Sequence, residues 1–75
     1  MNYQQRVEIL AANDALTVVE TGLKSAGRLL GAMNAAGLSE ASIERIQDAA
    51  ALADATRTPI RATLRRLEQI LRVEK

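Results

Sequence analysis

The chain has 75 residues, of which 48% are hydrophobic, with one aromatic residue, no cysteine and no histidine. That size allows one domain, residues 1–75, and the composition excludes disulfides and the usual histidine and cysteine ligand sets of zinc sites. The net charge of +1 gives no general attraction toward nucleic acid or membranes.

The first predicted element is a helix from about residue 3 to residue 36. Apolar residues recur there at alternating steps of three and four, which places them on one stripe of a helix. The stripe consists of Ile9, Ala12, Leu16, Val19, Leu23, Ala26, Leu30 and Met33. Gly37 follows as a natural C′ residue for this helix.

The second predicted element is a helix over residues 39–74, with Ser39 as N-cap and Glu40 in the first turn. Its stripe has the same spacing and consists of Ile43, Ile46, Ala50, Ala53, Arg57, Ile60, Leu64, Leu67 and Leu71. Pro59 lacks the N–H that would bond to Ala55, so we expect a kink or a short break there. A third helix beginning at Pro59, with Thr58 as its cap, is the alternative.

The short connection predicts an antiparallel helical hairpin, and therefore an all-α fold. If positions whose numbers add up to 76 face each other, the two stripes meet along their whole length and form one seam. A single layer breaks this pattern, because Val19 faces Arg57. A salt bridge from Arg57 to the neighbouring Glu20 is the structural explanation of that arginine.

The two edges beside the seam differ in polarity. We define the apolar edge as Ala11, Ala15, Val18, Gly22, Leu29, Ala49, Leu52, Thr56, Thr63, Ile70 and Val73. A single hairpin would leave this edge in water. Because a core of this size supplies only about 3–5 kcal/mol, we expect a homo-oligomer, such as a four-helix bundle.

No set of residues is typical of catalysis, so we expect a protein that is not an enzyme and that uses no cofactor or metal ion. The segment 33–46 is similar in spacing to a helix-turn-helix, which would make the chain a DNA-binding regulator. Its second helix would present Glu40, Glu44 and Asp48 to DNA, and phosphates repel such a surface. The sequence therefore disfavours nucleic acid as a partner.

The charged layer predicts a binding site for a small anion. A guanidinium binds carboxylates and phosphates by two parallel hydrogen bonds, and it stands here among hydroxyl side chains in a segment, residues 57–75, that carries +4. The predicted ligand-binding residues are Thr56, Arg57, Thr58 and Arg61, with Glu20, Gly22 and Tyr3 as contributors.

Two functions follow as hypotheses. In the first, a non-enzymatic homo-oligomer sequesters a small anionic ligand, such as a nucleotide, in pockets between subunits. In the second, the hairpin is a protein–protein interaction module that acts as an inhibitor or adaptor. We expect a cytoplasmic protein, because the first ten residues do not resemble a signal peptide and no apolar run is long enough to span a membrane.

Overall fold

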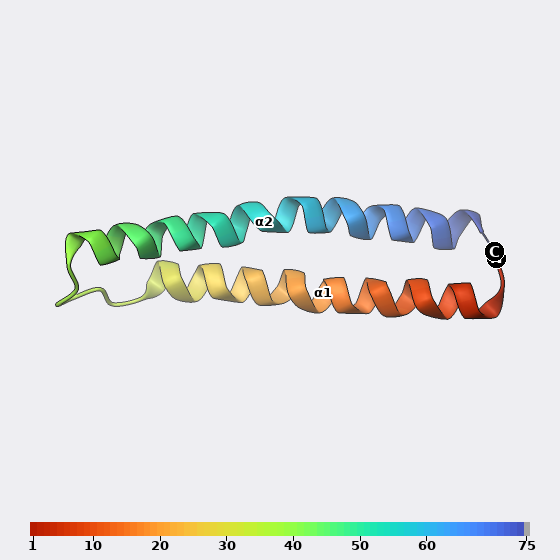
Figure 1. The fold of residues 1–75 in the computed structure, drawn as a ribbon, viewed down its shortest axis with the longest axis horizontal. Helices are drawn as coiled ribbons and strands as arrows, with labels where there is room; N and C mark the ends of the chain where they lie inside the picture. Colours follow the sequence, from red (N-terminus) through yellow and green to blue (C-terminus); the bar gives the residue numbers. More distant parts are fainter. Residues whose placement is uncertain (75) are drawn as a thin grey trace.

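The computed structural model describes residues 1–74, and Lys75 of the basic segment lies outside the described residues. Two helices, α1 (Tyr3–Ala32) and α2 (Glu40–Val73), lie side by side and antiparallel, with both ends of the chain at one end of the hairpin (Figure 1). The Cα atoms span 57 × 15 × 14 Å, so the molecule is a rod. The predicted all-α antiparallel hairpin is confirmed.

A capping box fixes the start of α1 at the predicted position. The Asn2 side chain accepts a 2.8 Å hydrogen bond from the Gln5 backbone, and the Gln5 side chain accepts one of 3.0 Å from the Asn2 backbone. These two bonds satisfy N–H groups that the first turn of a helix leaves unpaired.

The end of α1 differs from the prediction, because the helix stops at Ala32 and not at residue 36. Met33 is already extended, with ψ 137°, and the Asn34 side chain accepts a hydrogen bond from the backbone two residues on. Asparagine competes with helical bonding in this way. Gly37 has φ +86° and lies in a turn over residues 35–38 that a 3.1 Å backbone bond closes, so it is not a C′ residue.

The second helix begins as predicted and then runs through Pro59 without interruption (Figure 1). The Ser39 hydroxyl caps it by accepting a 3.2 Å bond from the Ser42 backbone. The expected short break at Pro59 is therefore wrong, and so is the alternative of a third helix. Contacts with α1 on both sides of the proline explain the continuity, because Arg57 bonds to α1 and Ile60 is half-buried in the seam.

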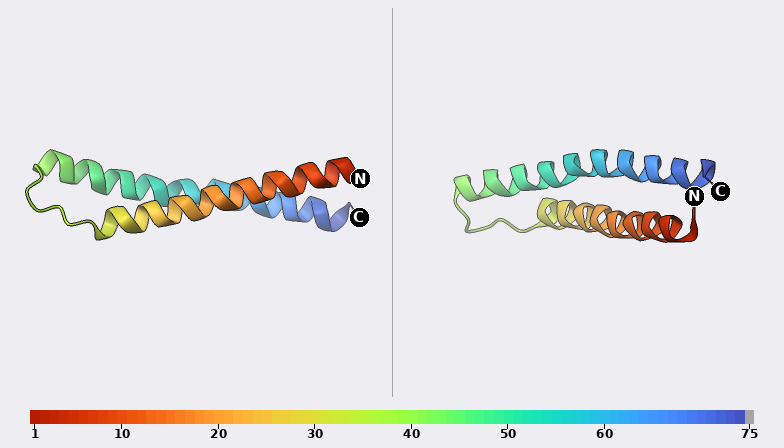
Figure 2. Two further views of the ribbon diagram at one scale, coloured as in Figure 1. Left: turned by 90° about the horizontal axis from the view of Figure 1, so that it is seen from below. Right: turned by 45° about the vertical axis from the view of Figure 1, so that its right-hand side comes forward.

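The seam of α2 is the predicted one, since every residue of its stripe is partly buried. On α1 the seam is turned by one residue over part of its length. Asn13 and Glu20 are half-buried, whereas their neighbours Ala12 and Val19 are exposed. Figure 2 shows the two helices crossing near their middles. The predicted layer of Val19 and Arg57 is thus replaced by one of Glu20 and Arg57.

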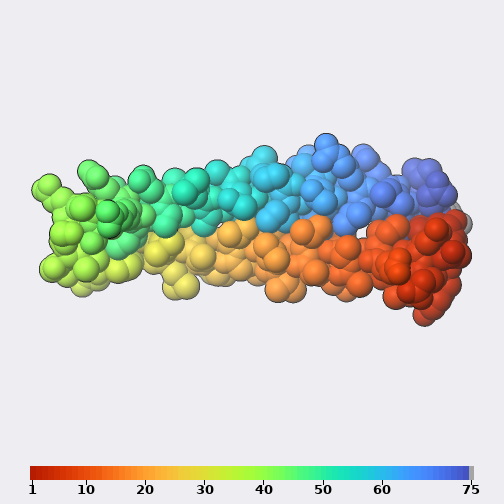
Figure 3. All heavy atoms as spheres, in the orientation of Figure 1, coloured from red at the N-terminus to blue at the C-terminus, as the bar shows by residue number. Residues whose placement is uncertain are grey.

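The register agrees with the prediction to within about one residue. A Cβ atom built on Gly27 would lie 3.7 Å from the carbonyl oxygen of Ala50, which is ordinary contact between the two backbones. Among residues 1–74 none is fully buried, so the half-buried seam is the whole core. The space-filling view shows the two helices lying against each other along the length of the narrow rod (Figure 3).

Candidate functional site

The predicted salt bridge between Arg57 and Glu20 forms at the middle of the seam. Arg57 Nε donates to Glu20 Oε1 at 2.9 Å, and the two side chains are only 13% and 17% exposed. Charges so far removed from water need partners, and each of these side chains has the other. The structural explanation of Arg57 is confirmed.

Two further charged groups complete this cluster. Arg61 Nε donates to the same oxygen of Glu20 at 3.0 Å, and Arg57 Nη1 donates to Asp54 Oδ1 at 3.0 Å. Asp54 was not among the predicted site residues, although its spacing of three residues from Arg57 is typical of an ion pair on a helix. Glu20 therefore holds two arginines, and each arginine is already bonded to a carboxylate.

The structure brings together only some of the predicted ligand-binding residues. Arg57 and Arg61 meet at Glu20, but the Thr56 hydroxyl donates to the backbone carbonyl of Leu52 at 2.6 Å. Residues two apart on a helix do not share a face, so Thr56 and Thr58 do not line one pocket.

The predicted contributors Gly22 and Tyr3 do not complete an anion pocket within the hairpin. A Cβ atom built on Gly22 would have nothing within 4 Å, so this position borders open space. Tyr3 is 81% exposed in the first turn of α1, at the end of the rod. Because α2 is continuous, no new helix N-terminus at Pro59 is present to attract an anion.

The apolar edge is the second candidate site, and all of its residues are exposed. Its large members are Val18, Leu29, Leu52, Ile70 and Val73. Because the seam of α1 is rotated by one residue, Val19 is also exposed, on the same side of the hairpin as the apolar edge. A soluble monomer rarely exposes a contiguous apolar strip of this length, so such a strip is typical of an interaction surface.

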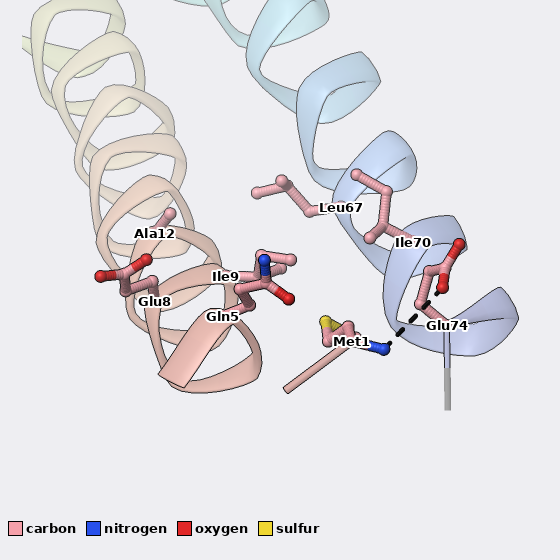
Figure 4. Close-up of a pocket in the computed structure, with 8 residues that line it drawn as sticks. All are labelled: Met1, Gln5, Glu8, Ile9, Ala12, Leu67, Ile70 and Glu74. Carbon is pink, nitrogen blue, oxygen red and sulfur yellow. Dashed lines mark ion pairs between the residues drawn. The ribbon is translucent and has the colours of Figure 1, made fainter. Parts of the chain in front are cut away.

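Near the chain ends this side of the hairpin is hollowed into an open groove of about 510 Å³ (Figure 4). It is lined by Met1, Gln5, Glu8, Ile9, Ala12, Leu67, Ile70 and Glu74. The amino group of Met1 lies 4.0 Å from the Glu74 carboxylate at its mouth. Glu8 and Ala12 of α1 thus border the same groove as Ile70 of the apolar edge.

Over residues 1–74, no cluster of acidic side chains has the arrangement of a metal site, and neither helix has an apolar stretch long enough to cross a membrane. Comparisons with protein-family models, with curated proteins and with solved structures gave no match to this chain. The geometry of the two candidate sites therefore carries the functional argument.

Proposed function

We propose that this chain is a non-enzymatic helical binding module that works as a homo-oligomer, with copies packed through the apolar edge. The observation that carries the proposal is the exposure of that edge in a chain with no fully buried residue among residues 1–74. Burying a leucine or valine side chain contributes about 1.5–3 kcal/mol. The apolar edge holds several such side chains, and the single hairpin leaves all of them exposed.

The accessible surface supports the same proposal. The hairpin exposes 5692 Å², whereas a compact monomer of 8.1 kDa exposes about 4,500 Å². The excess, about 1,200 Å², exceeds the roughly 800 Å² per partner that a stable protein interface buries. One copy packed along the apolar edge through an interface of that size would remove about two thirds of the excess.

Light scattering tests the proposal through the mass in solution. We expect at least twice 8.1 kDa, and a melting temperature that rises with protein concentration. Leu52→Glu places a charge in the centre of the apolar edge and should yield monomers. Ala51→Glu is the matched control, because Ala51 is exposed on the same turn but outside the edge. A wild-type monomer whose melting is independent of concentration would refute self-association.

A second candidate function, binding of a small anion, is favoured by one observation. Arg61 is half exposed, and within residues 1–74 its terminal guanidinium nitrogens make no hydrogen bond. An anion that bound Arg57 as well would have to compete with Glu20 and Asp54. Calorimetric titration of the oligomer with a nucleoside triphosphate tests this, with Arg61→Gln as the variant that should lose binding. No heat of binding to the wild-type oligomer would exclude this candidate.

A further inference from the structure

We propose that the second copy covers the apolar edge face to face with its loop at the same end of the rod, so that α1 of each copy lies over α2 of the other. This inference rests on the proposed self-association and adds the orientation of the partner. The corresponding two-fold axis runs along the rod and keeps every residue at its own height. Within one hairpin, the contacts of Glu20 with Arg57 and of Gly27 with Ala50 define those heights.

Two columns of residues at seven-residue spacing face the second copy. On α1 the column consists of Glu8, Ala15, Gly22 and Leu29, and on α2 of Arg45, Leu52, Pro59, Arg66 and Val73. All of these residues are exposed. A seven-residue spacing keeps side chains on one side of a helix, and the groove bordered by Glu8 and Ile70 shows that the α1 column and the apolar edge share a side.

The columns interleave when the heights are kept. Gly22 lies at a height between Leu52 and Pro59, and the space beside it is open. The side chain of the partner's Leu52, which is 66% exposed in the single hairpin, would fill that space. Leu29 lies between Arg45 and Leu52 in the same way. Large residues thus stand beside gaps or small residues, which is the condition for close packing of helices.

The charges on these columns favour the same orientation. With the loops at one end, Glu8 lies between the partner's Arg66 and Val73, within reach of a long arginine side chain. With the loops at opposite ends and the two rods centred on each other near residue 56 of α2, Arg45 would lie beside the partner's Arg66, and Glu8 near the partner's residue 34, where the α1 column has no arginine. Like charges at an interface oppose association, and only the first orientation brings Glu8 next to an arginine of the partner.

Cross-linking between single-cysteine variants tests the orientation, because the natural chain has no cysteine. Leu29→Cys and Ala49→Cys replace exposed residues of the apolar edge that lie at nearly the same height, on α1 and α2. A short bismaleimide should join them across the proposed dimer when the two variants are mixed. The matched mixture is Ala49→Cys with Thr63→Cys, whose sites are separated in this orientation by about 21 Å along the rod but become neighbours when the loops lie at opposite ends.

We expect cross-linking at least about tenfold faster in the first mixture, because the effective concentration falls steeply with the distance to be spanned. Faster cross-linking in the second mixture, with a dimer mass by light scattering, would overturn the orientation and leave self-association standing. A monomer mass for every variant and for the wild type would refute both.

A charge reversal gives an independent readout. Glu8→Arg should raise the dissociation constant of the dimer about tenfold, because two ion pairs per dimer become repulsive. Adding Arg66→Glu to the same chain should restore the wild-type constant. Failure of the double variant to recover would contradict the pairing of Glu8 with Arg66.

Discussion

The Glu20–Arg57 layer yields a prediction in which the loss of stability depends on which partner is removed. Glu20 accepts from both Arg57 and Arg61, whereas Arg57 also donates to Asp54. Replacing Glu20 by leucine therefore leaves a nearly buried guanidinium with only an exposed carboxylate as partner. Replacing Arg57 by leucine leaves Glu20 still paired with Arg61 and adds an apolar side chain to the seam.

The magnitudes follow from the burial of the pair. Breaking a fully buried ion pair costs about 3–5 kcal/mol and an exposed pair contributes about 0.2–1 kcal/mol. At 13% and 17% exposure, we expect Glu20→Leu to lower the free energy of unfolding by about 2 kcal/mol. Arg57→Leu should lower it by less than about 1 kcal/mol, and the double variant should match the wild type because a well-packed apolar pair is often neutral.

Urea denaturation, monitored by far-ultraviolet circular dichroism at one protein concentration, measures the free energy of unfolding of the wild type, the two single variants and the double variant. The expected loss for Glu20→Leu corresponds to a melting temperature lower by roughly 8–16 °C for a chain of this size. An Arg57→Leu variant less stable than Glu20→Leu would refute the reasoning. So would a double variant whose loss equals the sum of the two single losses, because the residues would then not be coupled.

Three further predictions concern the turn at Gly37, the proline inside α2 and the N-cap of α2, and the same urea denaturation measures each. Gly37→Ala should destabilise the hairpin by about 1 kcal/mol because φ is +86° there. The control is Gly31→Ala, at a helical position with open space around it, which should stabilise the hairpin by up to about 1 kcal/mol. Equal effects of the two substitutions would contradict the role of the turn. Pro59→Ala should stabilise by about 1–3 kcal/mol, since it restores an N–H within a continuous helix, and a loss would mean that contacts of the proline ring in the proposed dimer outweigh that backbone gain. Ser39→Ala should cost about 1 kcal/mol through the lost cap, and no change would show that water replaces that bond.

The sequence predicted the hairpin, its register and the central salt bridge because each is set by periodic spacing along two long helices. Thirty residues of α1 and 34 of α2 give many independent tests of one pairing. The end of α1 could not be predicted in the same way. Both Asn34 and Gly37 disfavour helical structure, and the conformation of the turn determines at which of them the helix ends.

The candidate anion site was harder to predict, because the sequence does not show which donors are already bonded. Thr56 and Arg57 are adjacent in the chain, yet one bonds to its own helix and the other to α1. Arg57 and Arg61 were both predicted site residues, and their spacing by one turn of a helix is compatible with one shared partner. That spacing could not show that a single oxygen of Glu20 would accept from both.

The turn of the α1 seam connects the charged layer with the apolar edge. Hydrophobicity alone would place Val19 in the seam, but burying Val19 opposite Arg57 would leave the guanidinium with only the exposed Asp54 carboxylate as partner, at a cost of about 2 kcal/mol. Turning α1 by one residue brings Glu20 to Arg57 and leaves Val19 48% exposed. That exposure is unfavourable in a single hairpin by about 1 kcal/mol. In the proposed dimer a second copy would cover Val19, so one rotation of α1 accounts both for the salt bridge in the seam and for a further exposed apolar side chain beside the apolar edge.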